Sequence, residues 1–128
     1  MARSDSISYQ IDEILTAYEK DVHKAMETSL EEEAEATAQQ LKSTSPKRVK
    51  GTRKGAYARS WRVTKRGDTF IVHNGKHYRL THLLENGHVV RNGEGTYGRA
   101  RAIKHIGPAE DVAEMKLPLR IEARLRRL

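Results

Sequence analysis

Apolar residues recur every three or four positions along the first third of the chain, with no proline or glycine between Ile7 and Leu41. The stripe comprises Ile7, Ile11, Ile14, Leu15, Tyr18, Val22, Ala25, Met26, Leu30, Ala34, Ala38 and Leu41. This spacing predicts a single amphipathic helix, and Ser4, Asp5 or Ser6 is suited to cap its start. At about 1.5 Å per residue the helix would be on the order of 50 Å long, more than the width of a small domain.

A helix that projects from a small body usually packs on another subunit. We therefore expect a homo-oligomer, with Tyr18, Val22, Met26, Leu30 and Leu41 at the interface. Alanine dominates the apolar side in the second half of the helix, which suits either close approach of a neighbour or partial exposure. A solvated helix end is the alternative interpretation.

The composition changes in residues 43–60, where lysine and arginine replace the apolar stripe. Pro46, Gly51 and Gly55 interrupt any regular pattern, and large apolar residues are nearly absent before Tyr57. We predict an irregular, mobile loop whose cations contact either DNA phosphates or a protein partner. The candidate contact residues are Lys47, Arg48, Lys50, Arg53, Lys54 and Arg59.

A β-hairpin is predicted next, from two strand patterns joined by a turn pair. Trp61 and Val63 alternate with polar residues, Gly67-Asp68 forms the turn, and residues 70–72 return before an Asn-Gly pair. Trp61 is the only tryptophan, and a strand of this kind normally buries such a residue in the core.

A short helix, further strands and a last helix are predicted for the rest of the chain. Residues 77–86 form the short helix, and Gly87 ends it in the left-handed conformation. Its core-facing residues are Tyr78, Leu80, Leu83 and Leu84. Strands are expected at 88–91 and near 100–105, with a flexible loop rich in glycine at 92–98 between them.

The last helix is predicted to begin at Pro108, with Glu110 and Asp111 in its first turn complementing the helix dipole. Its apolar side consists of Val112, Met115, Leu119 and Leu125. Pro118 lies inside this pattern and predicts a kink or break near Lys116.

The predicted fold class is α+β, with a long N-terminal helix, a small antiparallel β-sheet with a short helix, and a C-terminal helix. We expect a long helix over 1–42, a basic flexible loop over 43–60 and a small α+β body over 61–128. A length of 128 residues suits one such domain with an appended arm.

The formal net charge of +7 conceals an asymmetry between the two parts of the chain. Residues 1–41 contain three basic and ten acidic residues, whereas residues 42–128 contain 21 basic and seven acidic ones. Such a division is typical of a chain that meets a polyanion with one part and a different partner with the other. Cysteine is absent, which excludes disulfides, a thiol nucleophile and zinc–thiolate sites. With neither a signal peptide nor a membrane-spanning run in this sequence, we expect a soluble, intracellular protein.

Three residues at intervals of three, His82, Glu85 and His88, raise the question of a metal site. Zinc-binding histidines on a helix are usually four apart, and here Gly87 should end the helix before His88. The spacing therefore favours a structural role. Gly93, Gly95 and Gly98 match the dinucleotide fingerprint in letters only, because they do not open a helix after a first strand. No catalytic centre, metal or cofactor is predicted.

The order of features resembles a family of phage tail components that includes the gene-ten product of coliphage HK97. The resemblance rests on the long first helix, on the segments "TSPKR", "YARSW" and "HYRLTHLLENGH", and on "HIGPAED" before the last helix. Its most specific residues are Leu84, Glu85, Gly87 and Pro108, which the resemblance marks as structural. Many members have an apolar aromatic residue before that proline, where this chain has His105-Ile106-Gly107.

The resemblance implies a neck or tail-completion protein of the virion that is not an enzyme and is assembled in the host cytoplasm. Such proteins form a hexameric ring between the head connector or stopper and the tail terminator, around a channel crossed by double-stranded DNA. The acidic helix would then pack on the basic domain of a neighbour, and the basic loop would dock on a neighbouring ring or face the channel.

Two other functional classes fit parts of the sequence. A double-stranded DNA-binding module would contact phosphates through residues 47–66 and 99–104, and would bind duplex with a steep salt dependence. A small toxin-like nuclease would cleave in a metal-dependent reaction that His82→Ala or His88→Ala abolishes.

Overall fold

The computed structural model describes residues 3–47, 55–92 and 95–128 and has the predicted α+β class. Its elements in order are α1 (Arg3–Thr44), α2 (Ala56–Arg59), β1 (Trp61–Arg66), β2 (Thr69–Asn74), α3 (Leu80–Asn86), β3 (His88–Asn92), β4 (Gly95–Ala100) and α4 (Ile106–Leu125). The strands form two separate two-stranded antiparallel sheets, β1–β2 and β3–β4.

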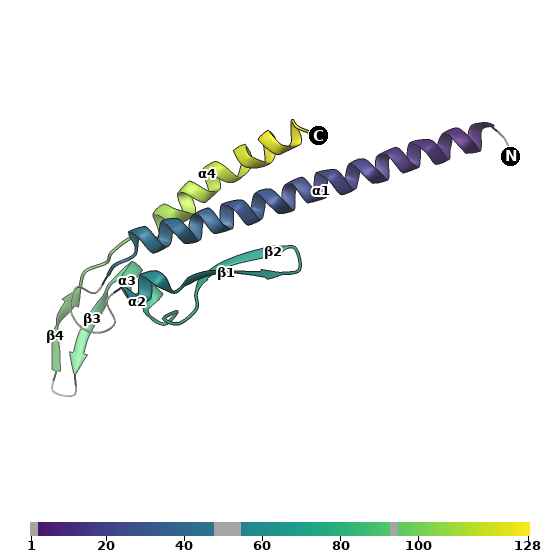
Figure 1. The fold of residues 1–128 in the computed structure, drawn as a ribbon. Helices are drawn as coiled ribbons and strands as arrows, with labels where there is room; N and C mark the ends of the chain where they lie inside the picture. Colours follow the sequence, from purple (N-terminus) through teal and green to yellow (C-terminus); the bar gives the residue numbers. More distant parts are fainter. Residues whose placement is uncertain (1–2, 48–54, 93–94) are drawn as a thin grey trace.

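Helix α1, with 42 residues, is the longest element, and it confirms the long predicted helix. Helix α4 runs antiparallel along its C-terminal half, and the β1–β2 hairpin lies along another side of that half (Figure 1). The N-terminal half extends beyond both, and every side chain from Ser6 to Asp21 is exposed. The same helix is therefore part of the packed body at one end and a projecting arm at the other.

Small residues allow the close packing of the second half of α1. Ala25, Ser29, Ala34 and Ala38 are all buried, and they face the neighbouring elements of the same chain. The alanine side of the helix is thus explained within one molecule, because short side chains let α4 and the hairpin approach the helix axis.

The β1–β2 hairpin and the burial of its tryptophan are confirmed. Trp61 pairs with Asn74 and Arg66 pairs with Thr69, so the register is regular from the base to the turn. Trp61 is 4% exposed and joins Leu41, Tyr57 and Ala109 in the core. This core sits where the C-terminal end of α1, α2 and the start of α4 meet, and Val72, Leu84 and Ile106 pack against it.

The second hairpin differs from the prediction of a loop at 92–98 and a strand near 100–105. Strand β4 occupies Gly95–Ala100 and pairs with β3, whereas residues 101–105 form no regular element. Glycines usually weaken a strand, and for this reason the segment was predicted to be a loop. Antiparallel pairing nevertheless provides hydrogen bonds for the backbone N–H and carbonyl groups whatever the side chains are. Residues 101–105 are held instead by α3, because the Ile103 N–H donates to the Leu84 carbonyl oxygen over 2.7 Å.

Helix α3 begins at Leu80 and contributes only one side chain to the core. Leu84 packs against it, whereas Tyr78, Leu80 and Leu83 are 59%, 40% and 42% exposed, so their predicted core positions are wrong. Helix α3 has seven residues and lies at the margin of a small core. Only one side of such a helix faces inward, and the rest of its surface faces solvent.

Helix α4 begins two residues before Pro108 and continues through Pro118, so the predicted break near Lys116 is wrong. Pro118 is exposed, which leaves the carbonyl that loses its helical hydrogen bond facing water. Beyond the proline, Arg120 and Arg124 hold the helix against α1 through ion pairs. Met115 and Leu119, which were predicted for the apolar side, are each 61% exposed on the outer surface.

Candidate assembly surfaces

Buried polar groups connect the elements at the C-terminal end of α1. The Trp61 indole Nε1 donates to the Ser45 Oγ over 2.7 Å, and the Asn74 amide Nδ2 donates to the Tyr57 carbonyl oxygen over 2.8 Å. The Asn74 Oδ1 in turn accepts from the His77 N–H over 2.8 Å. Because each of these buried groups has a partner, the end of α1, helix α2 and the hairpin form one rigid junction.

Glu85 closes this junction by capping α4 from a distant part of the sequence. Its carboxylate accepts the backbone N–H groups of His105, Ile106 and Gly107 at 2.9, 3.0 and 2.9 Å. These are the donors that a helix leaves unpaired at its start. Burial raises the pKa of the Glu85 carboxyl, but the three N–H groups and His105 outweigh this effect and hold the pKa below 4.5. No acidic residue lies in the first turn of α4 itself, so the predicted role of Glu110 and Asp111 is wrong.

His105 sits at the centre of the junction and is 1% exposed. Its Nδ1 lies 2.7 Å from the Ile103 carbonyl oxygen, which only accepts hydrogen bonds, so Nδ1 carries the proton. In the neutral ring, Nε2 then accepts the Tyr57 hydroxyl over 2.7 Å. Burial, together with the charge of Glu85, raises the pKa of Tyr57 to about 12 and keeps this hydroxyl a donor.

Gly87 allows β3 to turn away from α3. Its φ of 76° is positive as predicted, but its ψ of 170° is extended and differs from the left-handed helical conformation expected. A Cβ atom at this position would lie 2.7 Å from the Ala100 carbonyl oxygen and 3.1 Å from the Ala102 nitrogen. Only glycine fits this turn without a backbone shift.

Gly87→Ala is therefore expected to lower the free energy of unfolding by about 2 to 4 kcal/mol, from the unfavourable φ and the clash together. Gly67→Ala is the matched control, because Gly67 also has a positive φ (57°) but has open space around it. The control should cost only about 1 kcal/mol. Urea unfolding followed by circular dichroism measures both, and equal losses would contradict the role of the close contact.

The predicted basic contact residues lie partly outside the described residues. Arg48, Lys50, Arg53 and Lys54 fall there, whereas Lys47 and Arg59 are described and exposed. The segment 43–60 is not a surface loop throughout, because it includes helix α2 and buries Tyr57. Leu41, near the end of the predicted N-terminal segment, packs with Trp61 at the start of the predicted body.

The residues predicted for the oligomer interface have different environments. Tyr18 and Met26 are 57% and 42% exposed, and Val22 and Leu30 are half-buried. Leu41 is 3% exposed inside the core of its own chain, which removes it from any surface between subunits.

Acidic residues of α1 form ion pairs with basic residues from the later part of the same chain. Glu33 is bonded to Arg120 of α4, Glu32 is paired with Arg124, and Glu27 is bonded to Lys65 of β1. The acidic second half of α1 therefore attracts the basic part of the same chain. Packing on a neighbour is not required to explain the division of charge.

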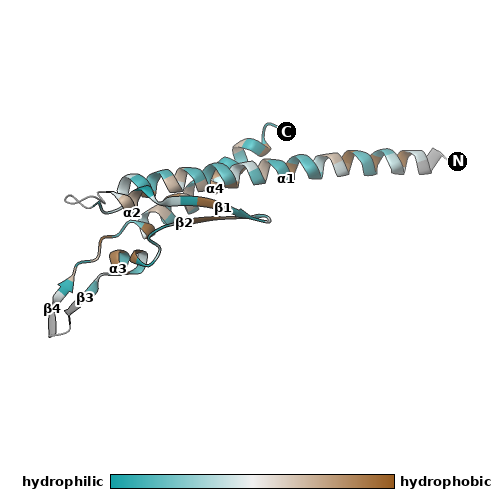
Figure 2. Ribbon diagram, turned by 60° about the horizontal axis from the view of Figure 1, so that its bottom comes forward, coloured by the Kyte–Doolittle hydropathy of each residue, from teal (hydrophilic) through white to brown (hydrophobic). Residues whose placement is uncertain are grey.

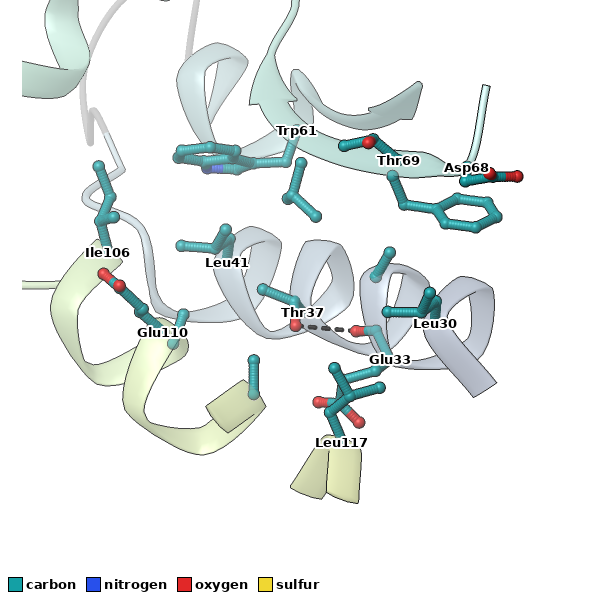
Figure 3. A pocket seen from close by; sticks show the side chains of 15 residues that line it. Leu30, Glu33, Thr37, Leu41, Trp61, Asp68, Thr69, Ile106, Glu110 and Leu117 are labelled. Carbon is teal, nitrogen blue, oxygen red and sulfur yellow. Dashed lines mark hydrogen bonds between the residues drawn. The ribbon is translucent and has the colours of Figure 1, made fainter. Parts of the chain in front are cut away.

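A groove opens between the hairpin and α4, with α1 as its floor (Figure 3). Leu30, Ala34, Thr37 and Leu41 lie along the floor. One wall is formed by Trp61, Phe70 and Val72 of the hairpin, and the other by Ile106, Ala113 and Leu117 of α4. Its volume is about 540 Å³. The charged residues in its lining are Glu33, Asp68 and Glu110, and Glu33 is paired with Arg120.

The three residues considered for a metal site, His82, Glu85 and His88, have different environments. His82 is exposed, Glu85 binds the start of α4, and His88 is the first residue of β3. Within the described residues, no group of three or more metal-ligating side chains is arranged to hold an ion. No helix in the same part of the chain is long and apolar enough to cross a membrane.

Of the two segments proposed for a DNA-binding face, residues 48–54 lie outside the described residues, and several of the described cations lie on two separate hairpins. Arg62 and Arg66 are on β1, and Arg99 is on β4. These hairpins extend in different directions from the junction (Figures 1 and 2). The described cations on these two hairpins therefore do not form one continuous basic strip, and Lys65 is bonded to Glu27.

The described structure combines a rigid junction, a projecting amphipathic helix and an apolar groove. The family described as "Bacteriophage HK97-gp10, putative tail-component" matches residues 10–87, which is more than half of the chain. The chain belongs to this family and is a structural component of a phage tail. The match ends at Gly87, so β3, β4, α4 and the Pro108 step lie beyond it. No curated protein and no solved structure matches the chain.

Proposed function

We propose that the protein is a neck or tail-completion protein that forms a ring at the head–tail junction. The ring, expected to be hexameric, joins the head connector or stopper to the tail terminator around the DNA channel. Its place in a tail-component family supports this role. The observation that carries the proposal is the projecting half of α1. Every side chain from Ser6 to Asp21 is exposed, although the segment contains six large apolar or aromatic residues, five of them at helical spacing.

The basic surface fits a protein that lies near DNA without holding it. Lys47 and Arg59 are exposed beside the junction, and the cations of β1 and β4 are spread over two hairpins. Scattered cations make weak contacts that salt screens, which a channel for passing DNA requires. A duplex-binding module is the second candidate, and the exposed Arg62, Arg66 and Arg99 favour it.

Removing the gene from its phage or prophage is the test of the proposed role. We expect lysates with DNA-filled heads and complete but unattached tails, seen by electron microscopy, and joining restored when the protein is supplied. Normal particles, or tails that fail before completion, would contradict a role at the junction.

A second measurement separates the ring from the DNA-binding module. The mass of the purified protein is measured alone and with the connector and terminator proteins, at low and high salt. A ring, alone or with those partners, supports the proposal. A monomer that ignores both proteins and binds duplex with a steep salt dependence supports the module instead.

A further inference from the structure

The projecting half of α1 carries an apolar stripe that no described element covers. Its members are all at least half exposed and are Ile7, Ile11, Ile14, Leu15 and Tyr18. Acidic side chains flank the stripe, three or four residues from its members, at Asp12, Glu19 and Asp21. An exposed apolar stripe with acidic edges is suited to a partner surface that is both apolar and basic.

The acidic residues beside the stripe are not neutralised within the described part of the chain. Further along α1, three glutamates form ion pairs with cations of β1 and α4. Among the described residues, Asp12, Glu19 and Asp21 take part in no such pair. The projecting half of α1 therefore offers both apolar area and negative charge to another molecule.

A basic and apolar surface lies at the opposite end of the molecule, around α3 (Figures 1 and 2). This α3 patch consists of exposed apolar side chains and exposed cations from residues 78–83 and 101–104, namely Tyr78, Leu80, Leu83, Ile103, Arg79, Arg101 and Lys104. Two hydrogen bonds hold the segments side by side. The Ile103 N–H donates to the Leu84 carbonyl oxygen over 2.7 Å, and the Lys104 Nζ donates to the Asn86 Oδ1 over 3.4 Å.

The positive charge of the α3 patch is also not neutralised. Residues 78–83 and 101–104 contain no acidic residue, and Glu85, the one acidic residue of α3, caps the start of α4. Within the described residues, none of the three cations of the patch forms an ion pair with a carboxylate. The patch therefore combines exposed apolar area with cations, which is what the stripe requires of a partner.

The other apolar surfaces complement the stripe less well. The groove between the hairpin and α4 has only acidic charged residues in its lining. On the outer side of α4, Met115 and Leu119 are exposed, but charges of both signs surround them, including Asp111, Glu122 and Arg126. Neither surface offers apolar area together with unopposed positive charge.

The stripe of a molecule does not reach the α3 patch of the same molecule. Helix α1 is unbroken from Arg3 to Thr44, and α3 lies at its C-terminal end, where Leu84 packs against the core that contains Leu41. From Tyr18 to Leu41 the helix rises by roughly 35 Å. A contact between the stripe and the patch therefore joins two molecules.

We propose that the stripe Ile7–Tyr18 of one copy docks on the α3 patch of a second copy. Apolar side chains meet apolar side chains, and the acidic edges of the stripe meet the cations of the patch. The contact joins opposite ends of the chain, so each copy gives its helix to one neighbour and receives the helix of another. Such a contact closes into a ring when its rotation permits. The inference rests on the proposed ring and names the surfaces that build it.

The first test places a charge in each apolar surface and the same charge at a matched control position. Ile14→Asp alters the stripe, and Thr16→Asp alters an exposed position of the same helix away from it. Leu83→Asp alters the patch, and Leu119→Asp alters an exposed leucine outside it. Circular dichroism establishes that each variant retains its helix content and melting temperature.

Sedimentation and light scattering measure self-association, in the presence of the connector ring if association requires it. Ile14→Asp and Leu83→Asp should each weaken association by about tenfold or more, and the two controls should match the unaltered chain. An equal mixture of the two weakened variants should form dimers and nothing larger, because one intact stripe meets one intact patch.

A reversal of charge tests the pairing of the two surfaces directly. One variant carries Arg79→Glu with Arg101→Glu in the patch, and the other carries Asp12→Arg with Glu19→Arg beside the stripe. Each alone should associate weakly, because like charges then face each other. An equal mixture should associate as the unaltered chain does, since each stripe finds a patch of opposite charge.

Cross-linking supplies a third readout, because the chain contains no cysteine. Copies with Ile14→Cys and copies with Leu83→Cys, mixed and joined by a short bismaleimide, should give a covalent dimer. Leu119→Cys in place of Leu83→Cys should give none.

Three results would overturn the inference: a chain that stays monomeric with and without the connector ring, mixtures that do not restore association, or association that Leu83→Asp and the reversed patch leave unchanged. If the reversed patch lowers duplex binding and leaves association unchanged, the patch contacts DNA instead. If only Ile14→Asp weakens association, two stripes pair with each other.

These outcomes are distinct from failure of the proposed function. If unjoined heads and tails accumulate without the gene while Leu83→Asp has no effect on association, only the docking fails. If docking occurs but heads and tails join without the gene, only the junction role fails.

Discussion

Trp61→Ala is expected to lower the free energy of unfolding by about 3 to 5 kcal/mol, which is a large part of the stability of a domain of this size. The indole is 4% exposed and contacts Tyr57 and His105 edge-to-face, with ring centroids 5.7 and 6.2 Å away. Its removal leaves a cavity in a small core and deprives the buried Ser45 hydroxyl of its donor.

Urea unfolding followed by far-ultraviolet circular dichroism measures this effect, since the variant contains no tryptophan for fluorescence. Ile71→Ala is the matched control, because Ile71 lies on the returning strand of the same hairpin and is 36% exposed. It should cost less than about 1.5 kcal/mol. Equal losses for the two variants would show that the junction does not depend on the tryptophan.

Glu85→Ala is expected to cost roughly 3 kcal/mol, because it leaves three backbone N–H groups at the start of α4 without their acceptor. Glu85→Gln should lose less, since the amide oxygen still accepts but carries no charge. Glu114→Gln, at an exposed position of α4, is the control and should change stability by less than about 0.5 kcal/mol. A loss no larger than that of the control would contradict the capping role.

The pH dependence of stability gives an independent check on Glu85. The pKa of Glu85 in the folded protein lies below the usual 4.5, so the folded state holds this proton less tightly than the unfolded state does. The stabilisation is therefore complete above pH 4.5 and is lost as the pH falls through the pKa of the folded protein. The unaltered protein should lose stability in acid more steeply than Glu85→Gln, and parallel curves would contradict this assignment.

The two halves of α1 have different surroundings in the described structure. The second half of α1 organises the body of its own chain through small buried residues and ion pairs with Arg120 and Arg124. The first half carries larger apolar residues that no described element covers. The junction capped by Glu85 sets the direction in which α4 leaves and so determines the shape of the groove.

The sequence alone predicts those helices, strands and turns that depend on residues close together in the chain. The apolar period of α1, the alternation of β1 with its Gly67 turn, and the helix stop at Gly87 can all be read along the chain, because propensity and spacing act within a few residues. The burial of Trp61 followed from its place on an amphipathic strand, and the segments around "LLENG" were sufficient to indicate the family. The exposed stripe at Ile7–Tyr18 was visible as part of a single continuous pattern.

Only the tertiary structure decided which parts of these patterns are covered. Glu85 caps a helix that begins some twenty residues later, and α3 turns Leu83 outward while Leu84 packs inward. Leu41 and Tyr18 belong to one apolar pattern in the sequence, yet the first is in the core and the second is exposed, because α4 ends before it reaches the projecting half of α1. Periodicity reports which side of a helix is apolar. Whether that side meets its own chain or another depends on contacts between residues far apart in the sequence.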